Sequence, residues 1–205
     1  MNIVLHHGDI DSSIDFGSSV AIDTEALGLQ IKRDALCLVQ LSSGDGVCHL
    51  VKFDIRKPYN APNLKKILED KNILKLYHYA RFDVAILKQY LGAESIPNYC
   101  TKIASKLTRT YTERHGLKDL CSSLLSIEIS KQERASDWSA DTLTESQKKY
   151  AASDVLYLHS LKKILDEMLN KNDRTELAKK CFDFIPTCVD LDLMNWDVGH
   201  IFGHK

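Results

Sequence analysis

The segment SVAIDTEALG, residues 19–28, combines two apolar side chains with two acidic ones in a pattern of period two. Because successive side chains of a strand point to opposite faces, a strand over residues 20–24 places Asp23 and Glu25 on the same face. Two carboxylates roughly 6–7 Å apart on one face repel each other unless water or a cation lies between them. Two interpretations remain open for this pair: a solvated strand end and a cation site.

Similar β-rich runs follow this segment, and the second half of the chain has a helical pattern. We expect strands at residues 36–41, 47–53 and 73–78, and the turn SSGDG makes the first two of these a hairpin. Expected helices begin near Pro62 or Asn63 and cover residues 82–91 (ended by Gly92), 101–107, 117–125, 145–169 and 174–184. The polar stretch 128–141 is expected to be a surface loop. The order favours an α/β or α+β fold in which helices cover a sheet.

Composition limits the class of protein. The 205 residues favour one domain, and 27 basic against 28 acidic residues give a net charge of −1. A protein that coats long nucleic acid usually has a basic excess, so a nucleic-acid partner would be short or locally bound. We expect a cytoplasmic protein, because the sequence has no signal-peptide pattern and no apolar run of membrane-spanning length. The six cysteines form no C-x-x-C pair and favour buried, reduced thiols over disulfides or zinc.

Two more acids fall among apolar residues of predicted helices. Asp83 is followed by Ile86 and Leu87 at helical spacing, so it shares an apolar stripe, although an acid near a helix N-terminus also interacts favourably with the helix dipole. Asp154 lies inside the predicted helix 145–169, on the same stripe as the apolar residues Ala151, Leu158, Leu161 and Leu165. An unpaired carboxylate there costs several kcal/mol, so a basic partner or a metal is expected.

Tyr150 lies one helical turn before Asp154 on the same face. Its phenol is placed to reach whatever Asp154 binds, and the alternative is an ordinary core aromatic. Carboxylate oxygens suit hard divalent cations, Mg²⁺ or Mn²⁺. Four carboxylates are enough to hold two such ions about 3.5–4 Å apart, an arrangement that serves phosphodiester hydrolysis.

These residues resemble the three motifs of the DEDDy 3′→5′ exonucleases. The motifs are Asp23-Thr24-Glu25, the His78–Asp83 segment HYARFD, and Tyr150–Asp154. The stretch 116–161 is similar to ribonuclease D, including its SDW and YA-x-x-DV-x-YL elements. The resemblance implies a ribonuclease H-like (DnaQ-like) mixed sheet flanked by helices. It also implies that Asp23, Glu25 and Asp154 hold one metal, that Asp83 with Asp23 completes a second, and that Tyr150 orients the attacking water.

The chain differs from ribonuclease D in length after the motifs, because only about 40 residues follow position 165 and no helical HRDC domain is expected. Residues 1–205 are expected to be a single exonuclease domain, with a motif core at about 18–165 and a helical extension at about 170–205. This organisation and residues 181–205 resemble the small bacterial nano-RNase C group. That resemblance implies cleavage of short single-stranded RNA, notably dinucleotides, to 5′-mononucleotides, by a homo-oligomer such as an octameric ring.

The residues alone leave alternatives to this function. One is ribonuclease D-like trimming of tRNA 3′ ends, and another is an exonuclease that also accepts DNA, because a metal site attacks a phosphodiester whatever its sugar. A more remote alternative is a non-catalytic nucleic-acid-binding module on the same fold, a class that typically loses one of the metal-binding acids.

Several further residues are candidates for substrate contacts. By resemblance, Leu27 is a wedge between bases and His78 contacts a phosphate, whereas the plain alternatives are a core leucine and a structural histidine. Trp138 is a candidate for base stacking or for an oligomer interface. Arg81, Arg109 and Arg134 are candidates for a 5′-phosphate clamp, against the simpler interpretation of surface arginines. His6, His7, His200 and His204 near the termini are expected to be surface residues rather than metal ligands.

Overall fold

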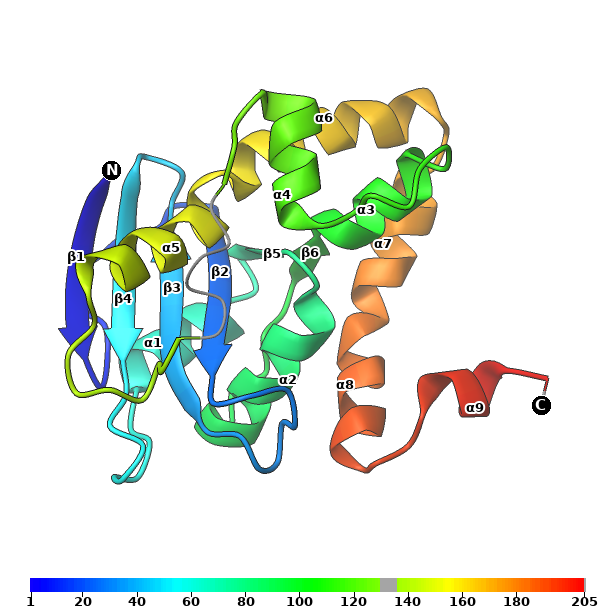
Figure 1. Ribbon diagram of the computed structural model, residues 1–205. Helices are drawn as coiled ribbons and strands as arrows, with labels where there is room; N and C mark the ends of the chain where they lie inside the picture. The colour runs from blue at the N-terminus through cyan, green and yellow to red at the C-terminus, as the bar shows by residue number, and fades with distance from the viewer. Residues whose placement is uncertain (130–135, 205) are drawn as a thin grey trace.

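The computed structural model describes residues 1–129 and 136–204, and these form one body around a six-stranded mixed sheet (Figure 1). The strand order is β1-β4-β3-β2-β5-β6. The strands are β1 (Asn2–His7), β2 (Ser19–Ala26), β3 (Leu36–Ser42), β4 (Val47–Lys52), β5 (Leu74–Tyr77) and β6 (Asn98–Cys100). The pairs β2–β3 and β3–β4 are antiparallel, and the other three pairs are parallel. The expected α/β class, with a mixed sheet between helices, is confirmed.

The central strands follow from the apolar pattern. All seven residues of β3 are buried, as expected for a strand covered on both faces. The predicted hairpin of β3 and β4 is present, and its turn uses Gly44 and Gly46 at φ +85° and +88°, a conformation that favours glycine. Strands β1 and β6 were not predicted. The first has histidines at its end and the second is only three residues long, so neither has a clear period-two signal.

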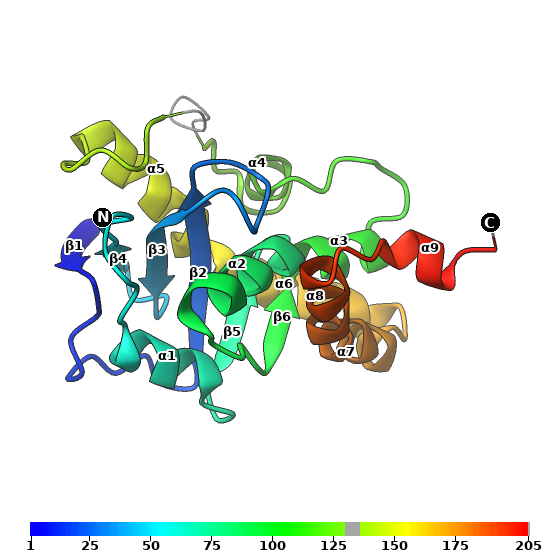
Figure 2. The same ribbon diagram turned by 90° about the horizontal axis from the view of Figure 1, so that it is seen from below.

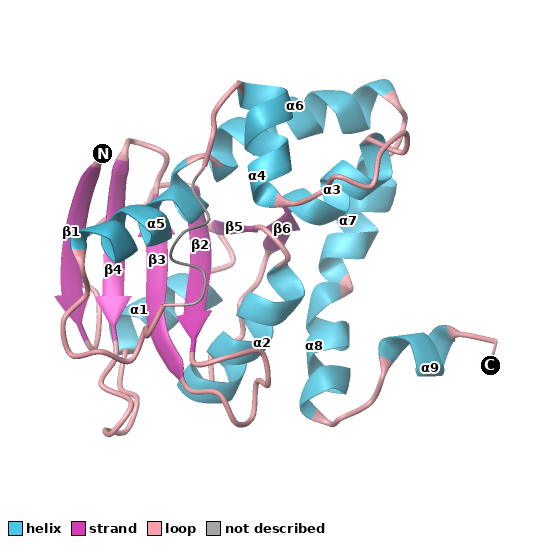
Figure 3. Ribbon diagram, viewed as in Figure 1, coloured by secondary structure: helices cyan, strands magenta, loops and turns pink. Residues whose placement is uncertain are grey.

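Helices cover both faces of the sheet (Figure 2). The helix α5 (Glu145–Leu156) packs across β2, β3 and β4 on one face, and α1 (Pro62–Glu69) and α2 (Ala80–Leu91) lie on the other. The remaining helices gather near β6 (Figure 3). They are α3 (Thr101–Thr108), α4 (Leu117–Leu120) with the π-helical turn η1 (Cys121–Leu125), α6 (Leu158–Lys171), α7 (Thr175–Asp183), α8 (Ile185–Leu193) and α9 (Val198–Phe202).

The predicted helix 145–169 is wrong as a single element. The chain breaks at Tyr157, so α5 lies on the sheet while α6 turns away to pack on α3. Leu158, Leu161 and Leu165 therefore belong to α6 and do not continue the face of Asp154. The predicted helix 174–184 is likewise followed directly by α8, which packs against α2.

The N-terminus of α5 is fixed by a capping box. Thr144 Oγ1 accepts a hydrogen bond from the Gln147 amide at 3.1 Å, and Gln147 Oε1 accepts one from the Thr144 amide at 2.9 Å. Gln147 Nε2 also donates to the carbonyl of Asp137 at 3.1 Å. These bonds hold α5 and the segment before it in one place, which matters because α5 carries Tyr150 and Asp154.

None of the helices in the described part of the chain is both long and apolar enough to cross a lipid bilayer.

Candidate active site

A cleft of about 790 Å³ opens where β2 ends, between the start of α2 and the helix α5. Its walls come from segments far apart in the sequence. The side chains that matter for the chemistry are Asp23, Glu25, Leu27, His78, Tyr79, Lys102, Trp138, Tyr150 and Asp154. Six of the seven predicted site residues, including the predicted substrate contacts Leu27 and His78, therefore line the cleft, and the seventh, Asp83, does not.

Three carboxylates meet in this cleft. One oxygen each of Asp23, Glu25 and Asp154 lies within 4.8 Å of the others, and all three residues are partly buried. Asp23 and Glu25 share one face of β2, as the period-two pattern predicted, and α5 crosses that face. Asp154 thus reaches the pair from above the sheet.

Asp83 lies on the other side of β2 and is only 3% exposed. Thr24, whose side chain points away from the face of Asp23, donates its hydroxyl hydrogen to Asp83 Oδ1 at 2.7 Å. Asp83 is in the first turn of α2, so the helix dipole also acts on it. It is not part of the group of three, but it is close enough for the charge of Asp23 to affect its ionisation.

Burial makes these acids hard to ionise. It raises the pKa of Asp23 to about 7, with a smaller opposing effect from the Thr24 amide. Burial and, to a lesser degree, the negative charge of Asp23 raise the pKa of Asp83 and of Asp154 well above the usual range for aspartate. A divalent cation would offset this penalty. The donors are all carboxylate oxygens, which fit Mg²⁺ or Mn²⁺ and do not resemble a zinc site.

Tyr150 lines the cleft beside Asp154, as predicted. Its ring lies 6.1 Å from that of Trp138, measured between centroids. Trp138 itself is 2% exposed, so it does not lie at the surface for an oligomer, but it does line the cleft, and base stacking stays a prediction. It packs inside its own chain and forms part of the wall behind Tyr150.

The two predicted substrate contacts have different settings. Leu27 is 50% exposed at the cleft, so the core-leucine alternative is wrong. His78 is held by a hydrogen bond of 2.8 Å between Nδ1 and Thr101 Oγ1. Burial lowers the pKa of His78 to about 3, so its ring is neutral at pH 7 and offers no positive charge to a phosphate.

Sequence reasoning missed Thr24 and the pair Tyr79–Lys102. The Lys102 ammonium lies 4.4 Å from the centre of the Tyr79 ring, and both side chains line the cleft. Tyr79 has φ +73°, which is strained for an aromatic residue and typical of functional sites. No period in the sequence predicts these features, because they depend on how α2, α3 and β2 meet.

The proposed arginine clamp is not supported for the described residues. Arg81 donates to the Asp192 carboxylate of α8 at 2.6 and 2.5 Å, which also raises the pKa of Arg81. Arg109 is buried and donates to the carbonyl of Arg114 and the hydroxyl of Ser123, so it is not a surface residue either. Neither lines the cleft. Arg134 lies outside the described residues.

The terminal histidines form no metal group among the described residues. His6 shares a hydrogen bond of 3.0 Å with His49, which is partly buried, so His6 is not simply a surface residue. His7 and His200 are exposed, as expected.

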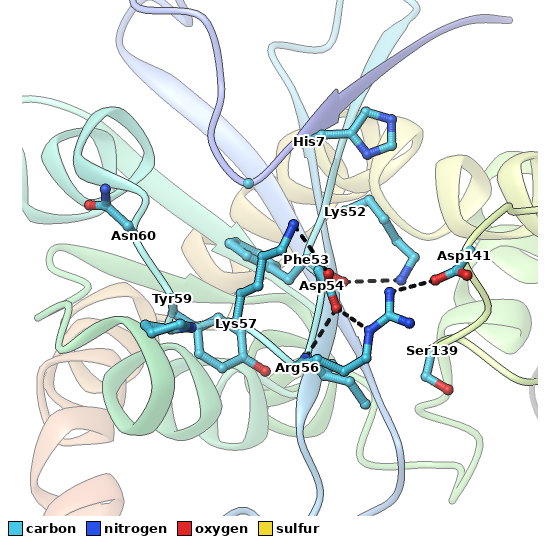
Figure 4. Close-up of a pocket in the computed structure, with 13 residues that line it drawn as sticks. His7, Lys52, Phe53, Asp54, Arg56, Lys57, Tyr59, Asn60, Ser139 and Asp141 are labelled. Carbon is cyan, nitrogen blue, oxygen red and sulfur yellow. Dashed lines mark hydrogen bonds and ion pairs between the residues drawn. The ribbon is translucent and has the colours of Figure 1, made fainter.

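A second pocket lies at the end of β4, and its charged side chains already have partners (Figure 4). Arg56 pairs with Asp54 at 2.7 Å and with Asp141 at 2.8 Å, and Lys57 lies 3.4 Å from Asp54. Lys52 donates to the carbonyl of Phe53 at 3.1 Å. With its cations already engaged, this pocket is a weaker candidate for phosphate chemistry than the acid-lined cleft.

Comparison with known proteins agrees with the geometry. The sequence pattern of the 3′-5′ exonuclease family matches residues 9–170, and the chain belongs to this family. Its fold is shared with full-length structures of NrnC from Brucella melitensis. One holds bound Mg²⁺ (48% identity, TM-score 0.95) and another is bound to pGG (50% identity, TM-score 0.95), and each comparison covers 100% of both chains.

Sequence relatives include ribonuclease D of Gluconacetobacter diazotrophicus, 34% identical over 77% of this chain. DNA polymerase I of Aquifex aeolicus is 32% identical over 74% of this chain. The chain spans 39% of that ribonuclease D and 24% of that polymerase. The family match over residues 9–170 contains all four acids.

The raised pKa of Asp23 gives a prediction for stability. Between pH 4 and 7 the folded, metal-free protein holds a proton that the unfolded chain has lost, so its stability falls as pH rises through this window. Asp23→Asn removes the contribution of Asp23 to that dependence, while Asp83 and Asp154 still contribute to it. In EDTA at pH 8 we expect the variant to exceed the wild type in free energy of unfolding by up to about 4 kcal/mol.

At pH 3.5 the two proteins should be nearly equal. Urea unfolding at a series of pH values measures the difference, and Asp141→Asn, an exposed carboxylate outside the cleft, is the control. A difference between Asp23→Asn and the wild type that does not grow with pH would contradict the assignment.

Proposed function

We propose that this protein is a metal-dependent 3′→5′ exoribonuclease that hydrolyses short oligoribonucleotides, above all dinucleotides, to 5′-mononucleotides. The observation that carries the proposal is the meeting of Asp23, Glu25 and Asp154 within 4.8 Å, with Asp83 behind them. The similarity over the whole chain to a nuclease bound to pGG supports a short substrate. A cleft of about 790 Å³ suits a small ligand better than a long strand.

Asp23, Glu25 and Asp154 are the proposed ligands of one divalent cation, and Asp83 with Asp23 the ligands of a second. When bound, Mg²⁺ or Mn²⁺ supplies a more acidic water and neutralises charge on the phosphate. Burial fits this role, because it strengthens the attraction between the carboxylates and a cation.

The other residues of the cleft position the substrate. Tyr150, one turn before Asp154, is proposed to orient the attacking water through its phenol. Leu27 would separate the last two bases. His78 would serve as a neutral hydrogen-bond partner, because its lowered pKa excludes a charged ring at neutral pH. Lys102 and Lys118 both line the cleft and would offset phosphate charge.

The two alternative functions predict different substrates. Trimming of tRNA by a ribonuclease D-like enzyme requires activity on long RNA, and a general exonuclease would also degrade DNA. The near-zero net charge favours the short substrate. We also propose a cytoplasmic location, consistent with six cysteines that are all free in the structure.

The activity test uses Asp154→Asn. We expect kcat/KM for 5′-labelled dinucleotides to fall by about 100- to 1,000-fold or more, because a charge that binds the cation is lost. The melting temperature in EDTA should stay the same or rise, since the raised pKa of Asp154 reflects a buried charge. Asp141→Asn is the control and should keep full activity.

The same assay, with RNAs of two to about ten nucleotides and matched DNAs, tests the substrate. Fast cleavage of the dinucleotide alone supports the proposal. Equal rates at all lengths would favour the tRNA-trimming alternative, and equal rates on DNA the general exonuclease.

Leu27 has its own prediction. Leu27→Ala removes an apolar contact with the bases, and we expect KM for a dinucleotide to rise about tenfold with a smaller change in kcat. Leu177→Ala changes a leucine of similar exposure on α7, away from the cleft, and should leave KM unchanged. Equal effects of the two substitutions would remove Leu27 from the site.

We propose that the protein is a homo-oligomer, such as the octameric ring of the nano-RNase C group. Exposed apolar side chains gather near the C-terminus, at Met194, Trp196, Ile201 and Phe202. The helix α9 stands away from the body in Figure 1. An exposed apolar patch of this kind is typical of a protein interface.

Light scattering after gel filtration tests this assembly. Trp196→Ser combined with Ile201→Ser should lower the molar mass towards that of one chain, 23.2 kDa. Tyr111→Ser, an exposed aromatic on a different loop, should leave the mass unchanged. A wild-type mass of 23.2 kDa would contradict the proposal.

A further inference from the structure

Gln40 is a polar side chain in an otherwise apolar strand. It lies in β3, is 0% exposed, and neither its Nε2 nor its Oε1 has a hydrogen-bond partner among the described residues. Buried amides are nearly always hydrogen-bonded, because an unmade bond leaves the full cost of removing the group from water. A leucine at this position would avoid that cost, so the amide requires an explanation.

The strand register places Gln40 beside a proposed metal ligand. In the antiparallel pair of β2 and β3, Gln40 is directly opposite Asp23. Residues in such a pair have their side chains on the same face, with Cβ atoms about 4.5–5.5 Å apart. The next two residues across the sheet in this row are Leu50 and Leu5, which are apolar.

The helix above this row offers little to an amide. The buried residues of α5, which packs on β2, β3 and β4, are Ala151, Ala152, Val155 and Gln147, and the Gln147 amide is already bonded to Thr144 and Asp137. The Asp23 carboxylate is therefore the polar side chain that the register places next to Gln40. A glutamine amide has two donor hydrogens, and an ionised carboxylate accepts at both oxygens, so the two groups are complementary.

We propose that Gln40 is a positioning residue whose Nε2 donates a hydrogen bond to the Asp23 carboxylate. This inference rests on the proposed function, because it assumes that Asp23 binds a divalent cation. The bond would fix the orientation of Asp23 and hold it ionised, which are the effects that partners of metal ligands have in other proteins.

The test measures Mg²⁺ binding rather than activity. Gln40→Met keeps the length of the side chain but removes both donors. Calorimetric titration should give a Mg²⁺ dissociation constant about 10- to 100-fold weaker than that of the wild type. In EDTA the melting temperature should be unchanged or higher, because two buried polar atoms without partners are removed. Weaker metal binding without loss of stability is a result that a purely structural residue would not give.

Val39→Ala is the matched control, because Val39 is the neighbouring buried residue of β3 and its side chain points to the opposite face. It should lower the melting temperature in EDTA and leave Mg²⁺ binding unchanged. Gln40→Leu provides a second apolar variant in case the methionine variant does not fold.

Mg²⁺ binding by the glutamine variants within twofold of the wild type would overturn the inference. Failure of the proposed function would give a different result. In that case the wild type itself would bind no Mg²⁺, or Asp23→Asn would bind Mg²⁺ as tightly as the wild type does. Tight binding by the wild type, loss in Asp23→Asn and an intermediate loss in Gln40→Met is the expected pattern.

Discussion

Mutual repulsion between buried carboxylates is the constraint around which this fold is organised. Asp23, Glu25 and Asp154 come from two elements that would separate if nothing else held them. The sheet fixes the first two through β3, which is buried along its whole length, and the capping box at Thr144 fixes α5 above them. Packing energy from the apolar core thus keeps charges together that would otherwise move apart.

The local features of this arrangement could be predicted from the sequence. The features that depend on contacts between helices and strands could not. The alternation in residues 19–28 was sufficient to place Asp23 and Glu25 on one face, because a strand has a fixed period. Asp154 was identified because it was expected to lie on an apolar stripe that runs along one long helix. That reason is only partly right, because the helix ends at Tyr157, where α5 is followed by α6. Strands β1 and β6 were missed because pairing with neighbours, and not their own pattern, makes them strands.

The basic residues show the same limit more clearly. Arg81 was a reasonable candidate for a phosphate clamp, because it lies within the HYARFD motif. Its guanidinium is nevertheless engaged by Asp192, more than a hundred residues later, in the ion pair that joins α2 to α8. Whether an arginine is available to a ligand depends on which acids the fold brings to it, and sequence spacing carries no information about that.

Several features of this site lower the stability of the metal-free protein and are explained by the proposed binding of a metal. Asp23, Asp83 and Asp154 have raised pKa values, Tyr79 has a left-handed backbone, and the Gln40 amide has no hydrogen-bond partner in the described part of the chain. Each feature costs free energy in the metal-free protein, and each lies at or directly beneath the same cleft. A divalent cation bound there would relieve the repulsion and keep Asp23 ionised, so that Asp23 could accept the proposed hydrogen bond from Gln40. Part of the binding energy of the cation would therefore stabilise the fold. The same cation would then find its ligands already in place, because the core and not the ion positions them.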